Sequence, residues 1–172
     1  FYGVGKVSAE KLKQAGILTG EDLFPLSKEE LEKKFGTLGP RLYLQVRGES
    51  NDQLTLHRER KSIGTERTLI KDTTDHGILT GYLEEFAQEL ERMLKKRSLA
   101  ARTITLKLRD SEFNTITKSV TMRDYLNKHD EIYSIAVQLF EEMMEERPIR
   151  LIGLTVSHLE NTNRLYKQLK LF

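Results

Sequence analysis

The segment Arg58–Leu69 divides the sequence into two parts of different character. It opens with the charged run Arg-Glu-Arg-Lys, and its second half alternates small or polar residues with Ile63, Thr65 and Arg67, as an extended strand does. Helical patterns punctuated by glycine precede this segment, and alternating strands separated by two amphipathic helices follow it. A chain of 172 residues is long enough for two small domains. We therefore predict a domain at 1–50, a linker at 51–60, a second domain at 61–160 and a tail at 161–172.

The composition excludes several kinds of site. The chain has no cysteine, which excludes disulfides and thiolate metal sites, and its four histidines lie singly without ligand spacing. No apolar run approaches the ~20 residues that a membrane span requires, and the first residues carry no signal-peptide pattern. We expect a cytoplasmic protein with no membrane partner. The start without methionine, close to a Gly-Val-Gly motif, predicts a piece of a longer protein.

The charges are sorted along the sequence, although the formal net charge is only +2. Residues 95–123 include eight basic residues against two acidic ones, a balance of +6. Residues 130–147 include six acidic residues against one arginine, a balance of −5. This segregation predicts a basic face for a polyanion and an acidic face turned away from it. On charge alone, an ordinary solvated surface with uneven charge is the alternative.

The first predicted helix follows a pair of glycines. Gly3-Val4-Gly5-Lys6-Val7-Ser8 leads into an amphipathic stretch, in which Ser8 is predicted to cap the helix start and Gly16 to end the helix. Two glycines at this place let the backbone approach a ligand closely, while free N–H groups and the helix dipole favour an anion. The arrangement suits a phosphate, although many tight turns share the Gly-x-Gly pattern.

Three further short helices are predicted in the first domain. Thr19 with Asp22 and Ser27 with Glu30 form capping patterns, Gly36 ends a helix, and Pro40 is predicted to open the next one. The apolar residues that recur along these helices are predicted to form a small core. They are Leu12, Ile17, Leu23, Leu26, Leu31, Phe35, Leu42 and Val46.

The second domain combines strands with two amphipathic helices. Apolar residues recur at helical spacing over 79–94 and 132–143, and strict alternation predicts a strand at Thr103–Arg109. Further strands are predicted from Lys61, over 115–122 and over 149–159. The order is βαββαβ, which predicts an α+β fold: a four-stranded antiparallel sheet with both helices on one face.

The other face of this sheet is predicted to be open and polar. Small hydroxyls, glycines and cations let a phosphate backbone approach closely, and the face holds no aromatic residue on which single-stranded bases could stack. Lys118 interrupts the apolar set of its strand, so we expect either a bulge that re-aims it or a position at the sheet edge. By alternation the face consists of Ser62, Gly64, Thr103, Thr105, Lys107, Arg109, Thr117, Ser119, Thr155 and Ser157.

Both halves resemble one protein family. The glycine pair before a helix resembles the helix-hairpin-helix motif, which holds a DNA phosphate without reading base sequence. Arg60-Lys61-Ser62-Ile63-Gly64 with Glu66-Arg67-Thr68, and Arg-Leu-Ile-Gly-Leu-Thr-Val at 150–156, resemble the little-finger domain of Y-family DNA polymerases. The chain is most similar to the bacterial DNA polymerase IV group, over essentially its whole length.

The resemblance implies a thumb and a little-finger domain that hold duplex DNA, chiefly by its phosphates, in a monomer devoted to translesion synthesis and DNA repair. The backbone amides of Gly3, Gly5 and Val7, with Lys6 nearby, would hold the primer strand. In the second domain, matching positions imply that Arg60, Lys61, Ser62, Gly64 and Lys118 would hold the DNA backbone. The predicted DNA contacts also include Arg58 of the tether and the face residues Thr103, Thr105, Lys107, Arg109, Thr117 and Ser119.

The catalytic parts of that family are missing from the sequence. Nucleotidyl transfer there uses palm carboxylates that hold two metal ions, expected to be Mg, and fingers that cover the incoming nucleotide. Both would precede Phe1. The resemblance therefore implies no catalytic residue and no cofactor within this chain, and we expect it to bind DNA without polymerising.

The sequence ends in Gln168-Leu169-Lys170-Leu171-Phe172, which closely resembles the peptide with which bacterial polymerases bind the sliding clamp. Leu169, Leu171 and Phe172 would fill an apolar pocket, while Gln168 would fix the register by hydrogen bonds. An apolar tail can also pack on its own domain, and this alternative is left open.

Two other classes of protein are alternatives. Helix-hairpin-helix motifs also occur in base-excision glycosylases, but those with lyase activity place a lysine where this chain has Val7. They also need an aspartate after a Gly-Pro pair, and here Gly39-Pro40 is followed by Arg41. The other alternative is an RNA-binding βαββαβ module with a fortuitous basic face. A preference for single-stranded RNA over duplex DNA would distinguish it.

Overall fold

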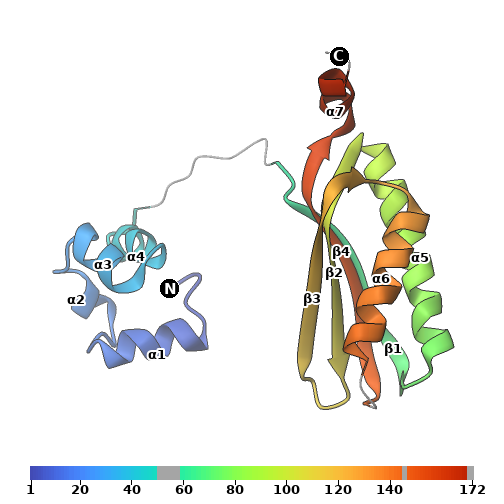
Figure 1. Cartoon of the computed structure of the whole chain (residues 1–172). Helices are drawn as coiled ribbons and strands as arrows, with labels where there is room; N and C mark the ends of the chain where they lie inside the picture. Colours follow the sequence, from blue (N-terminus) through green and yellow to red (C-terminus); the bar gives the residue numbers. More distant parts are fainter. Residues whose placement is uncertain (50–58, 145–146, 170–172) are drawn as a thin grey trace. The chain divides into compact units, whose positions relative to one another are not determined.

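A computed structural model shows two units, each with its own hydrophobic core (Figure 1). The structure describes residues 1–49, 59–144 and 147–169, and the boundary between the units falls within 50–58. The predicted linker at 51–60 therefore lies mostly outside the described residues, as does Arg58. No helix in the described part of the chain is both long and apolar enough to cross a membrane.

The first unit consists of four short helices: α1 (Lys6–Gln14), α2 (Gly20–Leu23), α3 (Lys28–Phe35) and α4 (Leu38–Val46). The predicted core is confirmed. Leu12, Ile17, Leu23, Leu31 and Leu42 are buried, and Leu26, Phe35 and Val46 pack against them.

The predicted capping patterns of the first unit are confirmed as two capping boxes. Ser27 Oγ accepts from Glu30 N at 3.2 Å, and Ser27 N donates to Glu30 Oε2 at 2.8 Å. This backbone hydrogen bond from Ser27 lowers the pKa of Glu30, and backbone hydrogen bonds from Leu18 and Thr19 lower the pKa of Asp22. The two helix starts are therefore held by ionised carboxylates, which satisfy N–H groups that have no helical acceptor.

Two predicted helix starts in the first unit are wrong. Helix α1 begins at Lys6 with Gly5 as its N-cap, so Ser8 is already the third helical residue and its side chain caps nothing. The backbone of Gly5 is extended, with φ −84° and ψ 179°, which places the start of the helix directly after it. Helix α4 begins at Leu38, two residues before Pro40. Proline is tolerated there because first-turn N–H groups have no helical acceptor.

The second unit is built on one antiparallel sheet of four strands: β1 (Ser62–Thr73), β2 (Leu99–Asp110), β3 (Thr115–Leu126) and β4 (Ile149–Asn161), in the order β1-β4-β2-β3. Strands β2, β3 and β4 are longer than predicted, and β1 begins one residue after Lys61. The alternation pattern did not reveal the first residues of β2, because Ala100 and Ala101 are adjacent and both buried, which breaks the alternation that marks a strand.

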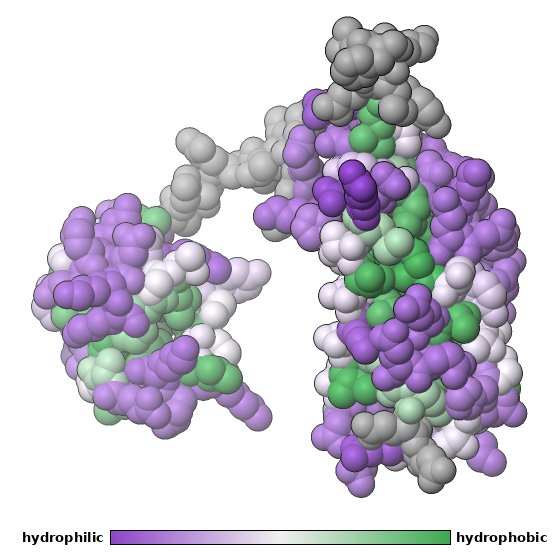
Figure 2. All heavy atoms as spheres, in the orientation of Figure 1, coloured by the Kyte–Doolittle hydropathy of each residue, from purple (hydrophilic) through white to green (hydrophobic). Residues whose placement is uncertain are grey.

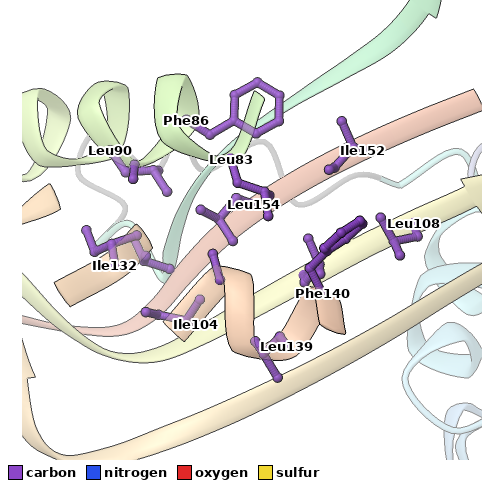
Figure 3. Close-up of a cluster of buried hydrophobic side chains, with 14 of the residues drawn as sticks. Leu83, Phe86, Leu90, Ile104, Leu108, Ile132, Leu139, Phe140, Ile152 and Leu154 are labelled. Carbon is purple, nitrogen blue, oxygen red and sulfur yellow. The ribbon is translucent and has the colours of Figure 1, made fainter. Parts of the chain in front are cut away.

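Two long helices, α5 (His76–Lys96) and α6 (His129–Met143), cover one face of the sheet (Figure 1). Helix α5 packs on β1, β4 and β2, and α6 packs on β2 and β3. Their buried side chains meet those of the central strands (Figure 3), as Leu83 and Phe86 do with Leu154 and Ile152. The predicted α+β fold is confirmed. A last helix, α7 (Thr162–Leu169), follows β4, and Thr162 N donates to Ser98 O at 2.9 Å.

Candidate nucleic-acid interface

The sheet register gathers the predicted polar residues into rows that cross all four strands. Positions 103, 105, 107 and 109 of β2 alternate with the buried Ile104, Leu106 and Leu108, so they project from the face opposite the helices. We call the four rows the polar face. They are Ser62-Ser157-Thr103-Thr121, Gly64-Thr155-Thr105-Ser119, Glu66-Gly153-Lys107-Thr117 and Thr68-Leu151-Arg109-Thr115. All ten residues predicted by alternation lie in these rows.

Two glycines let neighbouring side chains lie close over the backbone of the polar face. A Cβ added to Gly64 would lie 2.4 Å from Thr155 Oγ1, and one added to Gly153 would lie 2.8 Å from the Cβ of Glu66. Both positions therefore exclude any larger residue as long as their neighbours stay in place. The result is a surface of low relief, which a phosphate backbone can approach closely. The sequence alone could have assigned Gly153 to the polar face, because alternation places Gly153 and Leu154 on opposite sides of β4.

The cations of the polar face are held by neighbours in the same rows. Lys107 Nζ lies 2.8 Å from Glu66 Oε2, and Arg109 Nε donates to Thr115 Oγ1 at 2.7 Å. Glu66 therefore offsets part of the positive charge of the face. The Arg109 guanidinium keeps further N–H donors, which suit the paired oxygens of a phosphate.

Thr103 is an exception among the predicted open-face residues. It projects on the polar face but is only 6% exposed, because His158 covers it. Thr103 Oγ1 lies 2.8 Å from Thr121 Oγ1 and 2.8 Å from His158 Nδ1. Its hydroxyl is thereby engaged, and the expectation that Thr103 faces a phosphate directly is corrected.

Lys118 lies on the other face of the sheet. It sits on the edge strand β3, as one predicted alternative held, but its register partner is the buried Leu106. Its Nζ pairs with Glu142 Oε2 of α6 at 2.7 Å, and this hydrogen bond lowers the pKa of Glu142. The pair adjoins a groove between β3 and α6, where Figure 2 shows hydrophobic residues gathered in a strip. Side-chain alternation thus separates Lys118 from the other predicted DNA contacts.

The glycine pair forms an exposed turn at the start of α1. Gly3 has φ +84°, a left-handed conformation that glycine adopts without strain, and the first helical bond runs from Ala9 N to Gly5 O at 2.9 Å. The N–H groups of Lys6, Val7 and Ser8 therefore lie in the first turn, without side-chain capping or an acidic neighbour in that turn. Val7 is 72% exposed. Such a helix start favours an anion.

Arg41 of α4 adds a cation beside this turn, and sequence reasoning missed it. Its Nη2 lies 3.1 Å from the place where a Cβ on Gly3 would be, and its guanidinium carbon lies 5.9 Å from the ring centroid of Tyr2. Gln45 Nε2 also donates to Tyr2 O at 3.1 Å, so two side chains of α4 hold the turn. No local pattern marks Arg41, because its contact depends on how α4 packs.

The remaining predicted contacts are exposed to solvent or lie outside the described residues. Lys6, Arg60 and Lys61 are exposed. For the clamp peptide, the backbone of Gln168 and Leu169 belongs to α7, but their side chains and residues 170–172 lie outside the described part. Within that part, no group of three His, Asp, Glu or Cys residues could hold a metal ion.

Comparison with known proteins agrees with this architecture. The family model described as impB/mucB/samB family C-terminal domain matches residues 60–171, and the model described as DNA polymerase-iota, thumb domain matches residues 2–50. The chain belongs to the impB/mucB/samB family, that is, to the Y-family DNA polymerases that its motifs predicted, and it comprises a thumb and a little-finger domain.

Its relatives are DNA polymerase IV proteins. DNA polymerase IV of Leptospira interrogans serovar copenhageni is 40% identical over 171 residues, which cover 95% of this chain and 47% of that protein. Those of Listeria monocytogenes serotype 4a and Listeria innocua are each 45% identical over 161 residues, covering 93% of this chain and 45% of each relative. The chain thus spans slightly less than half the length of these relatives.

Proposed function

We propose that this chain holds primer-template DNA by its phosphate backbone, without reading base sequence, as part of a translesion DNA polymerase. The observation that carries the proposal is the two-sided sheet. Helices α5 and α6 cover one face, and the other presents rows of hydroxyls, glycines and cations. Polymerase activity, which the names of the relatives state for those proteins, is proposed only for a whole protein of the relatives' length.

The chemistry of the polar face supports contact with phosphates rather than bases. Hydroxyls of Thr105, Thr117 and Ser119 are neutral donors, while Lys107 and Arg109 supply positive charge. Such donors fix the position of a duplex and carry no sequence information. None of the sixteen residues in the four rows is phenylalanine, tyrosine or tryptophan, so the rows hold no large aromatic side chain on which unpaired bases could stack.

The turn before α1 supports the same chemistry on the first unit. N–H groups at the start of α1 can donate to a phosphate oxygen, with Lys6 and Arg41 as nearby cations. A grip built from backbone amides is insensitive to base sequence because it reaches only the backbone of the DNA. Both units would therefore contribute to affinity through phosphates.

The proposal is tested by fluorescence anisotropy with a labelled primer-template duplex at several salt concentrations. We expect binding that depends little on base sequence and weakens steeply with salt, with log K falling by about 0.9 per log unit of salt for each phosphate neutralised. Single-stranded DNA and RNA serve as competitors. Absence of duplex binding at low salt, or a preference for single-stranded RNA, would contradict the proposal.

We further propose that the C-terminal peptide binds a bacterial sliding clamp. The support is the sequence Gln168-Leu169-Lys170-Leu171-Phe172, in which apolar side chains would serve as anchors in a pocket. The double variant Leu171→Ala/Phe172→Ala is expected to abolish clamp binding in surface plasmon resonance and to leave duplex affinity unchanged. Lys170→Ala, within the same peptide, is the matched control and should bind the clamp normally. Full clamp affinity in the double variant would refute the proposal.

A further inference from the structure

His158 has an unusual backbone conformation for its place in the fold. Three non-glycine residues of the described part have positive φ: Ser98, Phe113 and His158, with φ 52°, 67° and 52°. Ser98 follows α5 and Phe113 lies in the turn between β2 and β3, whereas His158 lies within β4. The left-handed region is uncommon for residues other than glycine, and inside a strand it re-aims a side chain, as a bulge does.

The conformation brings the ring of His158 to the polar face. By alternation, position 158 would follow Leu154 and Val156, which are fully buried beneath the helices. Instead, His158 Nδ1 lies 2.8 Å from Oγ1 of Thr103, a polar-face residue, and His158 is exposed. Thr103 is covered in exchange, so the imidazole occupies the place at which the threonine would otherwise meet a ligand.

Thr103 contacts the ring of His158, and Thr121 contacts Thr103. A hydroxyl carries a single proton, so if Thr121 donates to Thr103 Oγ1, Thr103 donates to His158 Nδ1. A neutral imidazole then carries its proton on Nε2. Among the side chains of residues 1–49, 59–144 and 147–165, none is hydrogen-bonded to Nε2. In this direction of the hydroxyl chain, the Nε2 N–H of His158 is available to a ligand.

The surroundings of this N–H suit a phosphate. Ser157, which precedes His158, pairs with Ser62, and the exposed Lys61 directly precedes Ser62. We propose that His158 is a DNA-backbone contact at this end of the polar face, donating from Nε2 to a phosphate oxygen, with Thr103 and Thr121 as positioning residues. The inference rests on the proposed function of the polar face and adds to it a residue that neither alternation nor the family resemblance assigned.

The variant His158→Gly tests the contact. Glycine adopts φ near 52° without strain, so β4 keeps its shape while the ring is lost. We expect duplex affinity to fall about three- to tenfold, the effect of losing a hydrogen bond to a charged group. Ser98→Gly is the matched control, since Ser98 has the same φ and lies outside the polar face.

The positioning role is tested by Thr103→Val, which removes the hydroxyl and keeps the shape of the side chain. In wild-type protein, nitrogen-15 NMR should show an unprotonated Nδ1 and a protonated Nε2 on His158. In Thr103→Val, we expect a mixture of tautomers together with weaker duplex binding, and Thr103→Ser should restore both. A structural role alone would leave the tautomer of His158 unchanged.

The outcomes separate this inference from the proposed function. If wild-type protein does not bind duplex DNA, the proposed function of the polar face fails, and this inference fails with it. If wild-type protein binds and His158→Gly binds as tightly as wild type and Ser98→Gly, only the inference about His158 is overturned. A protonated Nδ1 and a bare Nε2 in the wild-type protein would likewise refute the donor role.

Discussion

Replacing Gly39 by alanine is expected to unfold the helical unit and to leave the sheet unit folded. A Cβ at Gly39 would lie 2.2 Å from Leu31 O, 2.3 Å from Leu31 C and 2.4 Å from Glu32 N. All three are backbone atoms of α3, so no side-chain rotation can relieve the clash. Helices α3 and α4 carry Leu31 and Leu42 of the core, and forcing them apart opens that core.

The expected size of the effect follows from the small size of the unit. Overpacking a core costs about 1–3 kcal/mol, and more where backbone must move. A unit of about 50 residues has a stability of about 3–7 kcal/mol by the usual per-residue values. The clash at Gly39 involves three backbone atoms that no rotamer change can move, so its cost is expected at or above the upper end of the overpacking range. A cost of that size reaches the lower bound of the stability of the unit, so we expect a large unfolded population at room temperature.

Heteronuclear NMR of the full chain measures this directly. In Gly39→Ala, amide signals of residues 1–49 should collapse to narrow dispersion, while those of residues 59–169 keep their positions. Gly20→Ala is the control within the same unit, because its Cβ would lie 3.5 Å from the side chains of Phe1 and Val46, an ordinary contact distance. A folded helical unit in Gly39→Ala would show that α3 and α4 do not approach each other as closely as described.

The double charge reversal Lys107→Glu/Arg109→Glu is expected to weaken duplex binding on the order of a hundredfold or more at low salt. Each change removes a proposed phosphate contact and would add a like charge next to the DNA. The loss of two neutralised phosphates should also lower the salt slope by about two. Both residues are partly exposed on the polar face, so the fold should tolerate the change.

A control with the same change in net charge uses the other side of the sheet unit. Lys95 pairs with Glu91 at 2.8 Å and Lys118 pairs with Glu142 at 2.7 Å, both away from the polar face. Lys95→Glu/Lys118→Glu should cost little stability, since exposed pairs contribute about 0–1 kcal/mol each. Duplex affinity should change far less than in the first double variant. Equal losses in the two variants would mean that overall charge, and not the polar face, determines binding.

Much of the fold and of the polar face could be predicted because the local patterns are regular. Strict alternation over 103–109 placed three apolar residues on one side, and the register then had to gather the polar residues of neighbouring strands on the other. Lys118 was harder. Side-chain alternation places Lys118 on the same side of β3 as Ile116 and Val120, which is the helix side, whereas the family resemblance implied that Lys118 contacts DNA. The ion pair with Glu142 agrees with the alternation.

Other features depend on information that no local pattern carries. The left-handed backbone conformation of a single residue, His158, exposes the His158 side chain and covers Thr103. The approach of Arg41 to Gly3 depends on the packing of α4, and the start of α1 at Lys6 depends on the extended backbone of Gly5. The side chains that would bind a clamp lie beyond the described residues, so that prediction still rests on sequence.

The one-sided packing of the sheet separates two selective pressures within a single strand. Along β2, packing in the core constrains Ile104, Leu106 and Leu108, whereas contact with solvent and ligand constrains the residues between them. Substitutions at Thr105, Lys107 or Arg109 can therefore change the proposed DNA contacts without repacking the interior. Substitutions at alternate codons of this short stretch of the gene can therefore change stability and binding separately. Related chains can differ in function at this face while they keep the same fold.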